Sequence, residues 1–102
     1  MPPDWNRQEI EAIVEAYFWM LGEQIAGSEF SKKNVIRRLQ LEGLTARNRS
    51  AIERKLSNVS AVLDEVSAPW LRGFKPLAHY QQALKERVLG VARRRGIPIR
   101  RE

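Results

Sequence analysis

Apolar residues recur every three or four positions in four segments of this chain, and no segment alternates apolar and polar residues over the length of a strand. A step of three or four residues places side chains on one face of an α-helix, whereas a half-buried β-strand repeats every two. The pattern therefore predicts an all-α fold, a compact four-helix domain with a helix-turn-helix-like core. The positions expected to face inward are Ile10, Ile13, Val14, Tyr17, Phe18, Leu21 and Ile25; Val35, Ile36 and Leu39; Ile52, Leu56, Val59, Val62, Leu63 and Val66; and Leu77, Tyr80, Leu84, Val88, Val91 and Ala92.

Capping residues predict where these helices begin and end. Asparagine and serine accept the free N–H groups of a first helical turn, a glutamate three residues later completes a capping box, and proline suits the first helical position. The predicted starts are Asn6 with Glu9, Ser31, Ser50 with Glu53, and Pro76. The first helix is expected to end near Ile25, before Gly27, the second near Leu41, and the fourth at Gly96.

The length of 102 residues allows one domain, placed at residues 1–92, with residues 93–102 as a basic tail or truncated linker. No run approaches the roughly 18 apolar residues of a membrane span, and the N-terminus lacks the basic and apolar start of a signal peptide, so a cytoplasmic location is expected. The chain has no cysteine and a single histidine, His79. We therefore expect no metal site and no cofactor.

Charge divides unevenly along the chain. Residues 1–30 hold one basic and six acidic residues, a net charge of −5, and residues 31–102 hold 17 basic and six acidic residues, a net charge of +11. A positive surface on an acidic support is the footprint of a protein that binds phosphates, and DNA is the expected partner. The alternative is internal pairing, in which the acidic segment only neutralises part of the basic one.

Basic residues gather at the start of the predicted third helix, in the stretch RNRSAIERKL. Arg47 and Arg49 precede the helix, and Arg54 and Lys55 follow within its first turns. A helix N-terminus already carries a partial positive charge, so arginines there oppose helix stability and favour a bound anion. Arg49 and Lys55 are expected to be exposed.

The candidate nucleic-acid-binding residues extend this group to the second helix and to the connection before the fourth. The full set is Lys32, Lys33, Arg37, Arg38, Arg47, Arg49, Ser50, Arg54, Lys55, Asn58 and Lys75. The cations are expected to hold the phosphate backbone while one or two residues of the third helix reach base edges. Asn58 has an equally good alternative role, a hydrogen bond to a neighbouring loop.

Two resemblances bear on function. DWNRQEIEAIVEAY followed by RSAIERKL is similar to the first and third helices of Myb-like helix-turn-helix domains. From Trp5 to about Val88, the chain resembles a small helical module near the N-terminus of bacterial HNH-type restriction endonucleases and related defence proteins. The stretches that carry this resemblance are IVEAYFWML, SKKNVIRRL, RSAIERKLSNVSAVLDE and GFKPLAHYQQAL. Phe74, His79 and Leu56 depart from that module's pattern. The second resemblance implies a nucleic-acid-associated module without the catalytic HNH part.

Two classes of function follow. In the first, the chain is a non-catalytic module that binds duplex DNA and is associated with a restriction or defence nuclease. In the second, it is a helical adaptor or weak homodimer that docks a protein through an apolar patch near Trp19, Met20 and Trp70. No catalytic residue is expected, because the acidic residues of the first helix lack a base, nucleophile or metal partner.

Overall fold

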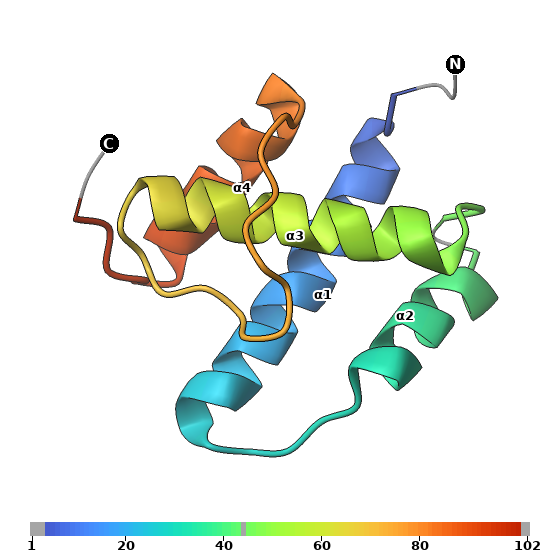
Figure 1. Cartoon of the computed structure of the whole chain (residues 1–102), viewed down its shortest axis with the longest axis horizontal. Helices are drawn as coiled ribbons and strands as arrows, with labels where there is room; N and C mark the ends of the chain where they lie inside the picture. The colour runs from blue at the N-terminus through green and yellow to red at the C-terminus, as the bar shows by residue number, and fades with distance from the viewer. Residues whose placement is uncertain (1–3, 44, 101–102) are drawn as a thin grey trace.

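The computed structural model describes residues 4–43 and 45–100 and confirms the all-α, four-helix fold. The helices are α1 (Arg7–Ala26), α2 (Lys32–Leu41), α3 (Arg49–Glu65) and α4 (Gln82–Arg94). In Figure 1, α3 crosses α1, and α2 and α4 lie on opposite sides of this crossed pair. Both α1 and α3 contact each of the other three helices. The core therefore forms around the crossing of α1 and α3.

Local capping explains the first two helices. The Asn6 side chain accepts from the Glu9 N–H at 2.8 Å and the Glu9 carboxylate accepts from the Asn6 N–H at 3.0 Å, which is the predicted capping box. Ser31 caps α2 by accepting from the Asn34 N–H. Gly27, at φ 77°, ends α1 in the left-handed conformation that glycine adopts most easily.

α3 begins at Arg49, next to the predicted start near Ser50, but the predicted capping box of Ser50 and Glu53 is wrong. Asn48 is the N-cap, and its side chain accepts from the Ala51 N–H at 2.9 Å. The carboxylate of Glu53, expected to complete a capping box, instead accepts from Arg49 Nε at 2.8 Å. Asparagine and serine cap about equally well, so the sequence alone did not separate the two positions.

The predicted start of α4 at Pro76 is also wrong, because the helix begins at Gln82. Residues 75–81 run in an extended course across α3 (Figure 1). The Leu77 N–H donates to the Ser57 carbonyl at 3.1 Å, and His79 adopts a φ of 67°, which a helix does not allow. We call residues 75–81 the strap.

Most predicted inward positions are buried, with informative exceptions. Ile25 is 60% exposed because the last turn of α1 projects beyond the core, and Leu77 is 44% exposed on the strap. Met20, expected in an exposed patch, is buried, whereas Trp19 is half exposed. The helix-turn-helix part of the expectation is not confirmed, since residues 42–48 form a longer connection than the short turn of that motif.

Tyr17 ties the centre of the core to the chain after α3. Its buried hydroxyl lies 2.8 Å from Ser60 Oγ and accepts from the Leu71 N–H at 2.8 Å. Burial raises the pKa of Tyr17 to about 12, so the hydroxyl stays protonated and can hydrogen-bond with both groups at neutral pH.

Replacing Tyr17 with phenylalanine is expected to lower the free energy of unfolding by roughly 1–3 kcal/mol, because the Leu71 N–H loses its partner inside the core. Chemical denaturation measures the change. The matched control is Tyr80→Phe, which removes a hydrogen bond to the exposed Glu65 carboxylate and should change stability by less than about 0.5 kcal/mol. Equal losses in the two variants would contradict the role given to the Tyr17 hydroxyl.

Candidate nucleic-acid interface

A concave surface of about 790 Å³ lies where the start of α3 meets Trp5, which precedes the N-cap of α1, and the strap. We call it the cationic cleft. Its lining residues are Trp5, Arg47, Asn48, Ala51, Arg54, Lys55, Asn58, Leu77, Ala78 and His79. Four of the predicted site residues, Arg47, Arg54, Lys55 and Asn58, therefore come together here.

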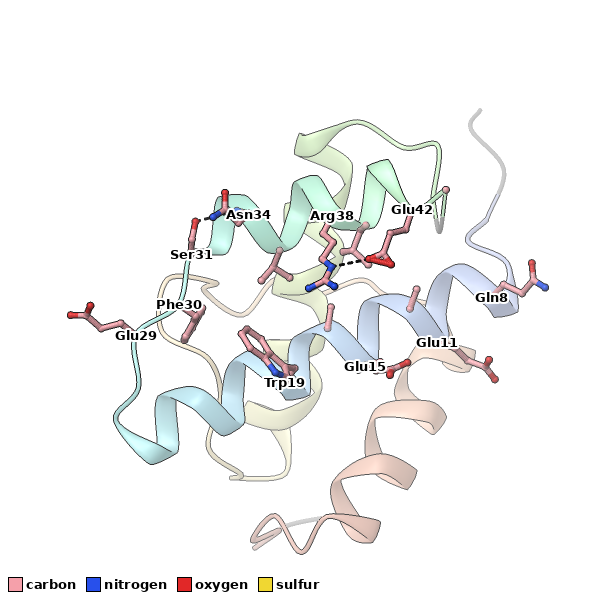
Figure 2. Close-up of a pocket in the computed structure, with 15 residues that line it drawn as sticks. Gln8, Glu11, Glu15, Trp19, Glu29, Phe30, Ser31, Asn34, Arg38 and Glu42 are labelled. Carbon is pink, nitrogen blue, oxygen red and sulfur yellow. Dashed lines mark hydrogen bonds and ion pairs between the residues drawn. The ribbon is translucent and has the colours of Figure 1, made fainter.

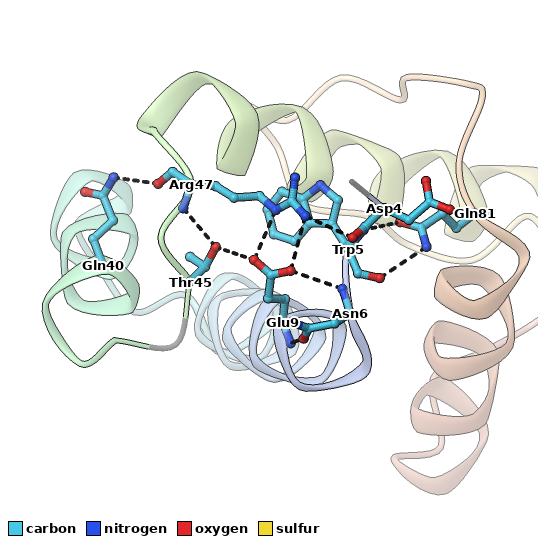
Figure 3. A network of polar contacts seen from close by, with 8 residues as sticks. All are labelled: Asp4, Trp5, Asn6, Glu9, Gln40, Thr45, Arg47 and Gln81. Atoms are coloured by element: carbon cyan, nitrogen blue, oxygen red, sulfur yellow. Dashed lines mark hydrogen bonds and ion pairs between the residues drawn. The ribbon is translucent and has the colours of Figure 1, made fainter. Parts of the chain in front are cut away.

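One wall of the cleft is a polar network built on Glu9 (Figure 3). Glu9 Oε2 accepts from Arg47 Nε at 3.0 Å and from Thr45 Oγ1 at 2.8 Å, and Glu9 Oε1 accepts from Arg47 Nη2 at 3.2 Å. The Arg47 guanidinium also lies 4.3 Å from the centre of the Trp5 ring. Arg47 is thus held by a two-point ion pair and a cation–π contact, and it links α1 to the chain before α3.

The ionisation of Glu9 reflects these contacts. Burial would by itself raise the pKa of Glu9, but hydrogen bonds from Arg47, the Asn6 N–H and Thr45 outweigh it, and the pKa is lowered. Glu9 therefore stays charged at neutral pH and neutralises Arg47. Arg47 therefore has a structural role in this ion pair, and that role competes with its predicted role as a phosphate contact.

Lys55 forms the floor of the cleft, and the prediction that it is exposed is wrong. Only 8% of Lys55 is exposed, because Trp5 closes over the inner face of α3 and its ring lies 5.2 Å from the ammonium. Within residues 4–43 and 45–100, the ammonium makes no hydrogen bond or ion pair. Burial lowers the pKa of Lys55 from its ordinary 10.5, and Arg47 lowers it further, while Asp4 and Glu9 oppose the shift.

Arg54 lies at the mouth of the cationic cleft, and Arg49 lies beside the cleft. Arg54 is exposed and, within the described part of the chain, makes no ion pair. Arg49 is exposed as predicted but pairs with Glu53 one turn along α3. Ser50 is exposed in the first turn and does not line the cleft. Arg54 is therefore the exposed cation that stands next to the buried Lys55.

Asn58 holds the strap rather than facing solvent. Its side chain is 5% exposed, and Nδ2 donates to the Leu77 carbonyl. The alternative role considered for Asn58, a bond to a neighbouring loop, is confirmed. The interpretation in which it reaches a base stays a prediction, and the bond to Leu77 competes with it. The strap crosses α3 at this point (Figure 1), and the α3 residues that line the cleft are Ala51, Arg54, Lys55 and Asn58.

The other predicted cations lie outside the cleft. Lys32 donates to the Arg72 carbonyl at 2.6 Å, and Arg38 pairs with Glu42 at 2.9 Å. Lys33, Arg37 and Lys75 are exposed. These residues do not share a lining surface with Lys55.

Sequence reasoning missed three groups that shape the cleft. They are the Trp5 ring under two cations, the Glu9 carboxylate that holds Arg47, and Gln81, whose side chain bonds both the N–H and the carbonyl of Trp5. Glu9 and Arg47 are 38 positions apart, and Gln81 and Trp5 are 76 apart. No local pattern links residues at such separations.

The described residues offer little else of recognisable chemistry. They contain no group of three or more histidine, cysteine, aspartate or glutamate side chains placed to hold a metal ion. None of the four helices in this part of the chain has both the length and the apolar character needed to cross a bilayer. Comparisons of the chain with protein-family models, with curated proteins and with solved structures find no match.

Proposed function

We propose that this chain is a non-catalytic nucleic-acid-binding module that holds backbone phosphates of duplex DNA in the cationic cleft. The observation that carries the proposal is Lys55, a residue only 8% exposed that lines the cleft and whose ammonium has no hydrogen-bonding partner among the described residues. Partial burial disfavours the charged form of Lys55, and a bound anion at the open side of its ammonium would offset that cost. Phosphate oxygens suit the three donors of a lysine ammonium.

The surroundings of Lys55 favour a polyanion over a small anion. Arg54 stands exposed at the mouth, and residues 31–102 carry a net charge of +11. A phosphate on Lys55 would bring neighbouring phosphates of the same strand toward further cations. The exposed Arg54 beside Lys55, together with the positive charge of residues 31–102, thus supports binding along a backbone.

The strap limits how far such a module would recognise DNA sequence. Residues 57 and 58 of α3 are bonded to the strap, so the middle of the helix is not free to enter a major groove. Contacts from the first turns of α3 would fall mainly on phosphates, which fix position without reading sequence. We therefore expect weak sequence preference.

The resemblance to the module of bacterial HNH-type endonucleases supports a narrower form of the proposal. It covers RSAIERKLSNVSAVLDE, which forms α3, and GFKPLAHYQQAL, which forms the strap and the start of α4. In that form the chain serves a restriction or defence nuclease by keeping it on DNA.

Replacing Lys55 with methionine is expected to weaken binding to a short duplex by about tenfold or more, because a charge-assisted contact to phosphate is lost. Fluorescence anisotropy over about 50–200 mM salt measures affinity, and the log–log slope should become flatter by about 0.9 for one lost phosphate. Arg54→Gln should act in the same direction. The control Arg87→Gln removes an exposed cation of α4 and should change affinity much less.

The thermal stability of the same variant provides a second measurement. Methionine keeps the aliphatic stem and removes a desolvated charge, so the Tm of Lys55→Met should equal or exceed that of the unmodified protein. Weaker binding with unimpaired stability would support a ligand-binding role. Unchanged titrations for both Lys55→Met and Arg54→Gln would overturn the proposal.

A further inference from the structure

A second concave surface, of about 850 Å³, lies between α1 and α2 (Figure 2). We call it the acidic groove. Its apolar lining is Ala12, Ala16, Trp19, Phe30, Val35 and Leu39. Trp19 is 50% exposed and meets Phe30 edge to face at 6.1 Å, so a large aromatic surface stands open to solvent in this part of the chain. No residue lines both the acidic groove and the cationic cleft.

The charges around this groove oppose the net charge of the chain. The groove is lined by four glutamates, Glu11, Glu15, Glu29 and Glu42, and one basic residue, Arg38. Arg38 is already paired with Glu42 at 2.9 Å. Among the described residues, Glu15 and Glu29 make no ion pair and are exposed. An apolar floor with free carboxylates at its rim thus occurs on a chain whose net charge is +6.

We propose that the acidic groove is a docking site for a cationic amphipathic helix of another protein. The apolar floor would accept the apolar stripe of such a helix, and Glu15 and Glu29 would pair with lysine or arginine beside the stripe. The groove follows α1 from Gln8 to Trp19, about 16 Å at the helical rise, which matches about three turns of a partner helix.

The basic helix α4 of a second copy is a poorer occupant. The apolar side chains of α4, Leu84, Val88 and Ala92, are buried in its own core. Docking α4 into another copy would expose them. The charge and shape of the groove therefore favour a separate partner.

The probe is a fluorescein-labelled synthetic helix of leucine and lysine, with leucines at a three- and four-residue spacing and about four turns long. Anisotropy should report saturable binding to the full chain that weakens as salt rises. Glu15→Lys and Trp19→Ser should each weaken binding by about tenfold or more, because one places like charges together and the other removes the apolar anchor. A peptide with glutamate in place of lysine should not bind.

Two matched controls separate the groove from the rest of the surface. Glu86→Lys makes the same charge reversal at an exposed position of α4, outside the groove, and should leave the affinity nearly unchanged. Lys55→Met should bind the peptide as the unmodified chain does, so failure of the DNA proposal and failure of this one are distinguishable. Circular dichroism confirms that each variant is folded.

Equal affinities for the unmodified chain, Glu15→Lys and Trp19→Ser would overturn the proposal. An equal loss in Glu86→Lys would also overturn it, since binding would then follow overall charge. Sedimentation of the chain alone should show a monomer. A concentration-dependent dimer that disappears in Trp19→Ser would assign the groove to a second copy and overturn the choice of a separate partner.

Discussion

Replacing Ile52 with alanine is expected to lower the free energy of unfolding by roughly 2–5 kcal/mol. Ile52 is fully buried in α3, one of the two helices that contact all three others, so truncation would leave a cavity that the packed helices cannot easily fill. Urea denaturation should show a lower midpoint with an unchanged slope, because the surface exposed on unfolding changes little.

The control for Ile52→Ala is Leu41→Ala. Leu41 ends α2 and is 75% exposed, so its truncation should change stability by less than about 0.5 kcal/mol. Comparable losses at the two positions would contradict the placement of α3 at the centre of the core.

Periodicity predicted Ile52 correctly because burial on a helix follows its 3.6-residue repeat. The same repeat failed at Ile25 and Leu77. Ile25 has the right spacing, but α1 outruns the core by a turn, and Leu77 belongs to the strap rather than to a helix. The period identifies a face, and the position of neighbouring elements decides how far along that face burial extends.

The strap shows why the start of α4 was predicted too early. Proline at position 76 and the apolar residues after it satisfy every local rule for a helix start. Residues 75–81 are kept extended by residues distant in sequence, through hydrogen bonds between α3 and Leu77 and between Gln81 and Trp5 near the N-terminus. Tertiary hydrogen bonds override local propensity here.

The charge pattern predicted a cationic surface, but it did not show which of the basic residues are paired, buried or exposed. The basic residues around α3 look alike in sequence, yet Arg47 is paired with Glu9, Arg49 with Glu53, Lys55 is buried and Arg54 is free of ion pairs within the described residues. The local pair Arg49–Glu53 has helical i, i+4 spacing and was predictable. The pairing of Arg47 and the burial of Lys55 depend on how α1 crosses α3.

Replacing Glu9 with glutamine is expected to lower the free energy of unfolding by roughly 2–4 kcal/mol. Glutamine can keep the capping bond to the Asn6 N–H, but its amide NH2 cannot accept from Arg47 Nε, so the change removes the charge together with that hydrogen bond. The side chains of Arg47 and Glu9 are 17% and 12% exposed, and without the carboxylate two cations would share the Trp5 ring. The exposed pair supplies the control, since Glu53→Gln should cost less than about 0.5 kcal/mol.

At low pH, the difference in the free energy of unfolding between Glu9→Gln and the unmodified chain should disappear. A carboxyl whose pKa is lowered on folding contributes stability above its unfolded pKa, ordinarily 4.5, and loses that contribution as the pH falls through the lowered folded value. Denaturation midpoints measured from neutral pH downward should therefore converge. A difference that persists at low pH would contradict an electrostatic origin and point to packing.

The same variant separates the two roles considered for Arg47. If Arg47 is a structural link, Glu9→Gln weakens the fold but leaves Lys55 and Arg54 in the cleft with one fewer opposing charge. Duplex DNA should then bind the folded variant at least as tightly as it binds the unmodified chain, under conditions where both are folded. A loss of affinity in the folded variant would mean that the Glu9–Arg47 pair, and not Lys55 alone, orders the phosphate site.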